Sequence, residues 1–264
     1  MTPTYEVFAI KYATHDRKAS ENFLFGDPHD GPMPIDYYVW AIKGAERSFV
    51  VDMGFDAPTA AARGRKLLRC PGEGLRLVGI DPATVEELIV THLHYDHAGN
   101  FDLFPKARFH LQDREVAYAT GRHMGHACLN HPFDVEHVVK TVRRVYAGQV
   151  AFHDGDAEIA PGLSVHRVGG HSDGLQFVRV WTARGWVVLA SDASHFYANM
   201  EQNRPFVVAF HIGAMLDAFR KLYELADSPV HVVPGHDPLV MARYPAPRPD
   251  LEGIVVRLDV DPRA

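Results

Sequence analysis

The segment 91–100, THLHYDHAGN, limits what this chain can fold into more than any other stretch, because it places three histidines and an aspartate within six positions. It follows a short apolar run that is typical of the end of a buried strand. On an extended segment residues two apart point the same way, so His92 and His94 can contact one metal ion. A turn after them, favoured by a glycine and an asparagine, directs Asp96 and His97 towards a second site.

This spacing indicates a metal site more strongly than a polar loop. The sequence contains 17 histidines, so a loop that is rich in histidine by chance is the alternative. The spacing is strict, however, and further candidate ligands recur downstream. Two neutral imidazoles suit zinc, and a carboxylate beside a third imidazole suits zinc, iron or manganese.

Three further candidate ligands each follow a predicted strand. His171 lies in GGHSDG, Asp192 in SDA and His236 in PGHD. Taken singly, each residue also fits a hydrogen-bonded core or turn position, and their shared place at strand ends favours ligation. The full candidate set is His92, His94, Asp96, His97, His171, Asp192 and His236.

Hydrophobic periodicity divides the chain into strands and helices. Apolar runs rich in branched and aromatic residues predict strands at 5–14, 37–43, 46–52, 88–91, 107–111, 149–153, 163–168, 175–181, 186–191 and 230–233. Capping residues and amphipathic stripes predict helices at 56–69, from Asp81 onward, at 113–120, at about 135–145 and at 211–226. From Pro245 onward we expect a proline-rich tail.

Composition fits a globular chain with an ordinary core. With 264 residues, of which 47% are hydrophobic, we expect one domain over 1–264 with a helical insert at about 113–147. The net charge of -6 disfavours a nucleic-acid partner. We recognise neither a bilayer-spanning run nor a secretion signal, so we expect a cytoplasmic protein with a small-molecule substrate and free thiols at Cys70 and Cys128.

Each of three features has two possible interpretations. The loop 16–36, with Phe23 and Phe25, forms either a rim over the active site or a flap packed on the core. Asp52 is either a turn carboxylate or a partner that orients a metal-bound group. The insert offers either a further metal site or a wall of the substrate pocket, and we expect the wall, because the spacing of its histidines matches no recognised ligand set. These histidines are His123, His126, His131 and His137.

The motifs, taken in order, resemble the metallo-β-lactamase superfamily through THLHYDH, GGHSDG, SDA and PGHD, over roughly residues 46–237. The resemblance implies an α/β fold, a four-layer αββα sandwich with the metals at one end of the paired sheets. It also implies two ions, Zn2+ by preference, with Mn2+ or Fe2+ as alternatives. The implied ligands are His92, His94 and His171 for the first ion, Asp96, His97 and His236 for the second, and Asp192 for both.

Within that superfamily the sequence resembles the N-acyl-homoserine lactonase and pyridoxolactonase group, through its length, SDAS and the closing GHD. This implies quorum-quenching chemistry: a hydroxide shared by the ions opens a cyclic ester or amide, and Asp96 or Asp192 passes the proton to the leaving group. The sequence departs from the group at one position. Those lactonases usually carry a tyrosine three residues after the bridging aspartate, where this chain has His195, with Tyr197 two residues further on. Either side chain is a candidate substrate contact.

Two other functions compete with the lactonase hypothesis. A glyoxalase-II-like thioester hydrolase would share the ligand set but would carry a basic C-terminal cluster, which the arginines after residue 240 do not evidently form. A non-catalytic metal-binding protein would not need the bridging carboxylate. The aromatic residues between 196 and 210, which we expect to be exposed, suit a contact between two copies, so we also consider a homodimer.

Overall fold

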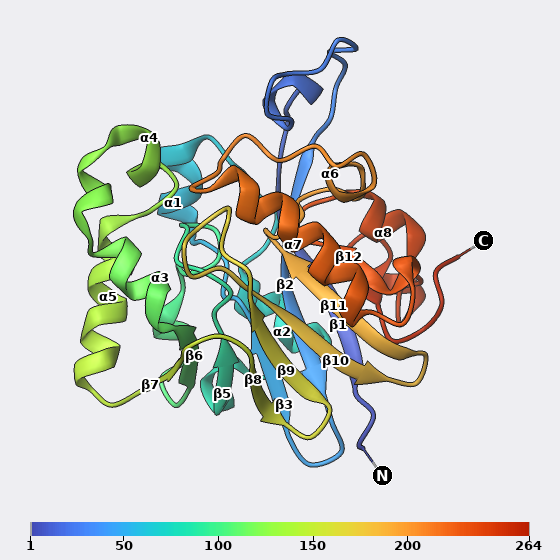
Figure 1. The fold of residues 1–264 in the computed structure, drawn as a ribbon. Coiled ribbons are helices and arrows are strands. Elements are labelled where there is room, and N and C mark those ends of the chain that lie inside the picture. The colour runs from blue at the N-terminus through green and yellow to red at the C-terminus, as the bar shows by residue number, and fades with distance from the viewer. Residues whose placement is uncertain (1, 264) are drawn as a thin grey trace.

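Two β-sheets face each other in the computed structural model, which describes residues 2–263 (Figure 1). Helix α7 (Ile212–Leu225) packs on the second sheet, and α2 (Pro71–Leu77) packs on the first. The layers are therefore helix, sheet, sheet and helix, which confirms the predicted α/β sandwich.

The first sheet contains eight strands within the described residues, in the order β13-β1-β2-β3-β5-β6-β7, with β4 paired to β1. Strands β3, β5 and β6 run parallel to one another. The strand bounds are β1 Glu6–His15, β2 Ile35–Lys43, β3 Ser48–Val51, β4 Lys66–Leu67, β5 Glu87–Ile89, β6 Arg108–Gln112, β7 Val150–His153 and β13 Val255–Arg257.

The second sheet contains five strands in that part of the chain, in the order β12-β11-β10-β9-β8. Its strand bounds are β8 Ala157–Ala160, β9 Leu163–Arg167, β10 Gln176–Thr182, β11 Gly185–Ser191 and β12 Val232–Pro234. The other helices are α1 Ala57–Arg63, α3 Asp113–Ala119, α4 Ala127–Asn130, α5 Val135–Tyr146, α6 Tyr197–Glu201 and α8 Leu239–Arg243. Helices α3, α4 and α5 lie between β6 and β7, where we predicted the helical insert.

The core lies between and around the sheets. In β2 every residue from Ile35 to Ile42 is buried, because one face packs within the sandwich and the other lies under the outer layer. The predicted stripe of α7 is also core: Met215, Phe219 and Leu222 are buried. No helix within residues 2–263 combines the length and apolarity that a membrane crossing requires.

Strand direction brings the candidate ligands to one edge. Strands β9 and β11 both run antiparallel to β10, and β12 runs parallel to β11, so all three end on the same side of the second sheet. In the first sheet β3 and β5 end side by side. Thr91 joins the two edges: its carbonyl accepts from the Gln176 amide at 3.0 Å, and its hydroxyl accepts from Ser191 at 2.9 Å.

Several predicted elements differ from the structure. The helix expected over 56–69 ends at Arg63, because Gly64 adopts a left-handed conformation (φ 64°) and the chain continues into β4. The helix expected from Asp81 is only a 3-10 turn, Pro82–Thr84. The expected tail after Pro245 instead contributes β13, whose Val255 and Val256 are buried against β1.

The aromatic residues near 196–210 do not form the exposed surface that we expected. Phe196, Tyr197 and Phe206 are all buried. The exposed aromatic surface that suggested a homodimer is therefore not present, and the homodimer stays a prediction. Both cysteines are free thiols, as predicted.

Candidate metal centre

Seven predicted ligands and one further histidine meet where the strands end. His92 and His94 follow β5, and His171, Asp192 and His236 follow β9, β11 and β12 respectively. Donor atoms fall into three groups, within each of which they lie no more than 4.8 Å apart. The groups are His92, His94, His171 and Asp192; Asp96, His97 and His236; and Asp192, His195 and His236. Each of these residues is buried.

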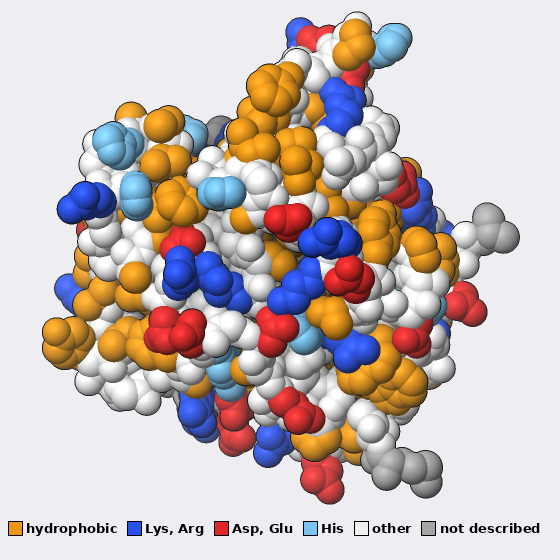
Figure 2. Space-filling model, viewed as in Figure 1, with side chains coloured by type: hydrophobic (Ala, Val, Ile, Leu, Met, Phe, Trp, Pro, Cys, Tyr) orange, Lys and Arg blue, Asp and Glu red, His pale blue; other side chains and the backbone are white. Residues whose placement is uncertain are grey.

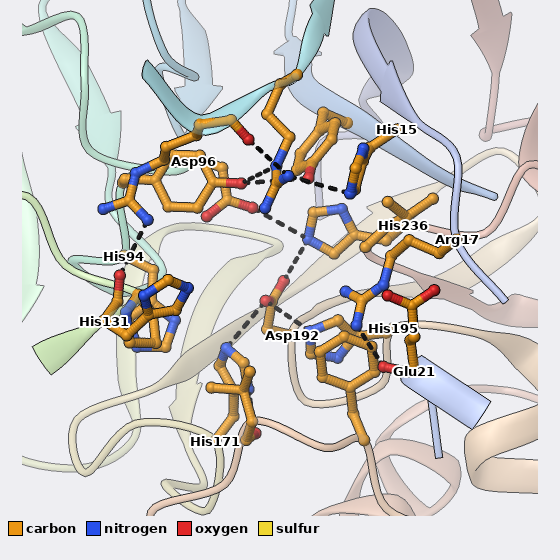
Figure 3. A pocket seen from close by; sticks show the side chains of 18 residues that line it. His15, Arg17, Glu21, His94, Asp96, His131, His171, Asp192, His195 and His236 are labelled. Atoms are coloured by element: carbon orange, nitrogen blue, oxygen red, sulfur yellow. Dashed lines mark hydrogen bonds and ion pairs between the residues drawn. The ribbon is translucent and has the colours of Figure 1, made fainter. Parts of the chain in front are cut away.

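Asp192 lies at the centre of the cluster (Figure 3). One carboxylate oxygen, Oδ1, is 3.2 Å from His97 Nε2 and 2.9 Å from His236 Nε2. The other, Oδ2, is 3.1 Å from His171 Nε2 and 3.0 Å from His195 Nε2. The two oxygens thus face the two predicted ligand groups, which is the geometry that a bridging carboxylate needs.

Backbone carbonyls fix the orientation of two of the imidazoles. His171 Nδ1 donates to the Val208 carbonyl at 2.7 Å, and His236 Nδ1 donates to the Asp36 carbonyl at 2.8 Å. Because a carbonyl can only accept, Nδ1 carries the proton in both rings and Nε2 presents a lone pair to the centre. This is the arrangement that metal-binding histidines commonly use.

Asp52 plays the same part for His97. Its Oδ2 lies 2.7 Å from His97 Nδ1 and accepts from the Thr91 hydroxyl at 2.8 Å, while Oδ1 accepts from the Thr91 amide at 2.8 Å. The contact with a candidate ligand favours the second interpretation of Asp52. Its left-handed backbone (φ 60°) turns the chain at the end of β3.

The electrostatics suit bound cations. Burial holds the pKa of His92 and of His94 well below the usual range, which keeps both imidazoles neutral. Burial alone would raise the pKa of Asp192, but the surrounding histidines, first His195, lower it well below its ordinary value. Burial would lower the pKa of His97, yet Asp192, Asp96 and Asp52 raise it well above 6.5. Metals require ionised carboxylates and neutral imidazoles as donors. Asp192, His92 and His94 already meet this requirement, whereas a metal would have to displace a proton from His97.

Unpartnered nitrogens test whether the residues fit a metal. The Nε2 atoms of His92, His97 and His171 are buried and form no hydrogen bond with any residue in 2–263. Buried polar atoms are rarely left unsatisfied, so several that face one point indicate a ligand there. The residues therefore fit one or two ions, with nitrogen and oxygen donors of the kind that zinc accepts.

Glu115 in α3 ties two ligand loops together. Its buried carboxylate accepts from the Leu93 amide at 2.8 Å, from the Ser172 hydroxyl at 2.5 Å and from the Gly174 amide at 2.9 Å. A side chain at Gly174 would place Cβ 2.1 Å from the Glu115 backbone nitrogen, so only glycine allows this approach. Glu115 was not among the predicted residues.

A pocket of about 310 Å³ opens onto the cluster. Side chains from the loop after β1, from the segment after α1 and from the insert surround it (Figure 3). Arg17 and Glu21 come from the first of these, Arg65 from the second, and His131 and Pro132 from the third. A substrate in this pocket would lie between the candidate ligands and a rim rich in cationic side chains.

The loop 16–36 combines both predicted roles. Phe23 is buried, and the Leu24 amide donates to the Pro205 carbonyl at 2.8 Å, so part of the loop packs on the body of the protein. Arg17 and Glu21 line the pocket, so another part forms a rim. Phe25 contributes to neither, since 94% of it is exposed.

The structure separates His195 from Tyr197. His195 lines the pocket and stacks on Phe206 with ring centroids 3.5 Å apart. Tyr197 instead packs beneath Arg243, whose guanidinium carbon lies 3.8 Å from the ring centroid, and it is not part of the pocket lining. Of the two predicted substrate contacts, only His195 is positioned to act there.

The insert histidines do not form a metal group among the described residues. His126 and His131 are exposed, and Figure 2 shows histidine side chains on the surface over α4. Only His131 lines the pocket, which agrees with the expected role of the insert as a wall.

Sequence reasoning missed other lining residues because no motif marks them. Arg17, Arg65 and Tyr37 reach the pocket from segments far apart in the chain. Tyr95 is the exception: it lies inside THLHYDH, and its hydroxyl accepts from Arg65 Nε at 2.9 Å. Its position between two pairs of predicted ligands could have indicated that it lies near the site.

The sequence matches the Metallo-beta-lactamase superfamily over residues 33–240. The chain therefore belongs to this superfamily, as its fold and its ligand cluster also indicate.

Sequence relatives are N-acyl homoserine lactonases. The enzyme of Bacillus cereus is 29% identical over 166 residues, which cover 62% of this chain and 60% of the relative. That of Agrobacterium fabrum is 31% identical over 135 residues, which cover 48% of this chain and 47% of the relative. The chain thus spans about three fifths or less of the length of these relatives.

Solved structures share the fold. The crystal structure of a quorum-quenching N-acyl homoserine lactone lactonase has a TM-score of 0.74 at 23% identity, covering 90% of this chain and 93% of that chain. A homoserine lactone hydrolase with N-hexanoyl-L-homoserine bound at its catalytic metal centre has a TM-score of 0.72 at 22% identity, covering 90% and 94%.

Proposed function

We propose that this protein is a two-metal hydrolase that opens the ring of a lactone. The convergence of the other six predicted ligands on Asp192, beside a pocket, is the observation that supports this function most directly. The lactonase relatives support the substrate class. We propose zinc as the ion, because imidazoles make up most of the donor set.

Bound ions would supply Lewis acidity and an ionised water at neutral pH. The chain's own residues then perform three tasks. Asp192 and the histidines fix the donor geometry, Asp52 holds His97, and Asp96 faces the pocket, where it can carry a proton. Water oxygen bonds to the lactone carbonyl carbon, the ring C–O bond breaks, and the alkoxide takes a proton, which leaves a hydroxy acid.

His195 stands at the position where lactonases usually carry a tyrosine. Burial lowers the pKa of His195 to about 3, so the ring is neutral at ordinary pH. Its Nδ1 is buried without a hydrogen-bond partner, while Nε2 faces Asp192. We propose that His195 positions Asp192 and that Tyr197 takes no part in substrate binding.

The test is a panel of γ- and δ-lactones that includes an N-acyl homoserine lactone. Zinc-loaded protein is offered each lactone while proton release is followed with a pH indicator. We expect turnover of at least one lactone and its loss in His171→Ala. His126→Ala removes an exposed histidine outside the pocket and serves as the matched control.

The outcomes separate the competing functions. Turnover of a glutathione thioester without turnover of any lactone would replace the proposal with the thioester hydrolase. Metal binding without turnover of either class would point to a binding protein. The C-terminal arginines give the thioester reaction no support, since Arg248 pairs with Asp250 and Arg263 with Glu252, away from the pocket.

A further inference from the structure

Two arginines from different segments of the chain line the pocket. Arg17 comes from the loop after β1, and Arg65 from the link between α1 and β4. Both line the same pocket as Asp96 and Asp192. Figure 3 shows Arg17 on the side of the pocket next to Glu21. Both are half-buried, so their charges are less well solvated than those of surface arginines.

Neither guanidinium has a carboxylate partner. Among residues 2–263 no ion pair involves Arg17 or Arg65, although Arg204 pairs with Asp27 at 2.7 Å and Arg263 pairs with Glu252 at 2.9 Å. The carboxylate of Glu21, which also lines the pocket, accepts instead from the Lys18 amide at 2.7 Å.

Donors of both arginines remain available. Arg65 uses Nε on the Tyr95 hydroxyl at 2.9 Å and Nη1 on His15 and the Arg63 carbonyl at 3.0 and 2.8 Å. Within the described chain, no hydrogen bond uses Arg65 Nη2. Arg17 donates from Nη2 to the Glu21 carbonyl, and its Nη1 and Nε are not engaged there either.

Arg63 provides a comparison in the same pocket. Its Nη1 donates to the His131 carbonyl at 2.9 Å and its Nη2 to the Phe133 carbonyl at 2.7 Å, so it braces the insert. Arg63 therefore uses both terminal nitrogens on backbone carbonyls, whereas Arg17 and Arg65 each keep one terminal nitrogen without a partner in the described residues.

The positive charge of the two arginines favours the binding of an anion in the pocket. Burial lowers the pKa of the Arg17 guanidinium; Glu21 acts against this, and the charge of Arg65 acts in the same direction as burial. Two divalent ions would exceed the charge of Asp96 and Asp192 and add to the positive potential. Glu21 and Asp96 offset part of the charge of the two arginines but form no ion pair with them in the described residues. Half-buried cations without a paired carboxylate are costly, and a bound anion relieves that cost.

We propose that the substrate is a lactone that carries a carboxylate, and that Arg17 and Arg65 hold this carboxylate while the ring faces the metal centre. This inference rests on the proposed function and narrows its substrate class. A planar carboxylate matches the fork of donors on a guanidinium, which an uncharged acyl chain does not.

A matched pair of substrates tests the proposal on the zinc-loaded protein. One is a γ-lactone with a carboxylate substituent on the ring, and the other is its uncharged carboxamide. We expect kcat/KM to be at least about tenfold higher for the carboxylate, since a charge-assisted hydrogen bond commonly gives a factor of this size. Added salt should lower this ratio, because screening weakens attraction between charges.

Variants assign the effect to the two arginines. In Arg17→Gln and in Arg65→Gln the ratio of the two kcat/KM values should fall towards one. Arg76→Gln is the control, because Arg76 pairs with Asp81 on the surface outside the pocket. Arg17 lies in a loop, so its variant keeps the test intact if Arg65→Gln fails to fold, which a thermal melt reveals.

Three other results of these kinetic measurements would each contradict a different part of the proposal. Equal kcat/KM for both lactones in the wild type overturns the carboxylate and leaves the lactonase function standing. An equal fall for both lactones in the arginine variants assigns the arginines to the carboxylate that ring opening creates, and also overturns the proposal. Turnover of neither lactone, nor of any lactone in the wider panel, overturns the proposed function and this substrate with it.

Discussion

Asp192 shows how one side chain can organise a whole site. Its two oxygens contact the imidazoles of His97, His171, His195 and His236 within 3.2 Å. The preceding residue, Ser191, has a left-handed backbone (φ 46°), which is unfavourable for a residue with a Cβ atom. Its hydroxyl donates to Thr91, and this contact between the sheets helps to hold the unusual conformation that turns Asp192 inward.

At the residue scale, Asp192→Ala tests the bridge. Removal of the carboxylate takes a donor from both ligand groups, so we expect the metal content to fall from two equivalents to one or fewer. Activity should fall by more than the roughly 10–100-fold that loss of a merely supporting residue costs. Elemental analysis and lactone turnover measure the two effects.

The control for this variant is Asp217→Ala. Asp217 pairs with Arg220 on the surface, so its removal should change neither quantity. Two retained metal equivalents and unchanged turnover in Asp192→Ala would contradict the proposed bridge.

At the scale of elements, hydrogen bonds to helices hold the loops that carry the candidate ligands. Glu115 at the start of α3 receives three hydrogen bonds from the two loops that carry His94 and His171. Helix α7 supports the second loop, because the Gly170 carbonyl accepts from the His211 amide at 2.8 Å. Each loop is thereby fixed by a helix outside its own sheet.

Glu115→Gln tests this arrangement. The Leu93 amide donates to one carboxylate oxygen, and the Ser172 hydroxyl and the Gly174 amide donate to the other. The amide of glutamine keeps only one of these acceptors, so either the first donor or the other two would face an NH2 group. We expect a loss of about 1–3 kcal/mol in the free energy of unfolding. Urea denaturation of the metal-loaded protein measures it.

A matched change on the surface isolates the effect of burial. Glu136→Gln alters an exposed residue in the first turn of α5 and should cost far less than Glu115→Gln. Equal stability of the two variants would show that Glu115 does not tie the loops.

At the scale of the whole molecule, the cluster makes stability depend on metal and pH. Without ions, the carboxylates raise the pKa of His97 and of His236, although burial alone would lower both. The unfolded chain titrates near the ordinary histidine value of 6.5. The folded metal-free protein therefore binds more protons above pH 6.5, and it loses stability as pH rises towards the folded pKa of these groups.

We expect metal removal to destabilise the protein more at high pH than at low pH. Metal binding needs deprotonated ligands, so the affinity rises over the same pH range in which the metal-free protein weakens. Free zinc at a hundred times its Kd adds about 2.7 kcal/mol. Melting temperatures of chelator-treated and zinc-loaded protein at pH 6.5, 7.5 and 8.5 provide the measurement.

The difference between the two melting temperatures should widen with pH. A constant or narrowing difference would show that His97 and His236 do not bind the metal through the nitrogens that titrate. His92 and His94 do not mask the effect, because their lowered pKa values act below pH 6.5.

Much of the fold could be predicted from the sequence, because local residue patterns indicate where strands and helices lie. The strand ends before His92, His171 and Asp192 follow from apolar runs that break at glycine and polar residues. The stripe of α7 was equally clear. The helix over 56–69 was misjudged because Gly64, a terminator in the structure, lies within a composition that otherwise suits a helix.

The tail was misjudged for a different reason. Strand β13 has only three residues, and it exists because Phe8, Ala9 and Ile10 on the edge of β1 pair with it. Short strands carry almost no pattern of their own, so their partner decides them. The same holds for β4, whose two residues pair with Ala13 and Thr14 of β1.

The sequence by itself determined the donor set, since metal chemistry demands particular side chains and their motifs are local. Only the tertiary structure decided what surrounds that set: that Glu115 joins two loops, that His195 rather than Tyr197 faces the pocket, and that Arg17 and Arg65 share one rim. These residues meet because strand direction and loop packing bring distant segments together: Arg17 and His195 line one pocket although they are 178 positions apart in the sequence. No local pattern records such a meeting, because it depends on the free energy of the whole folded chain.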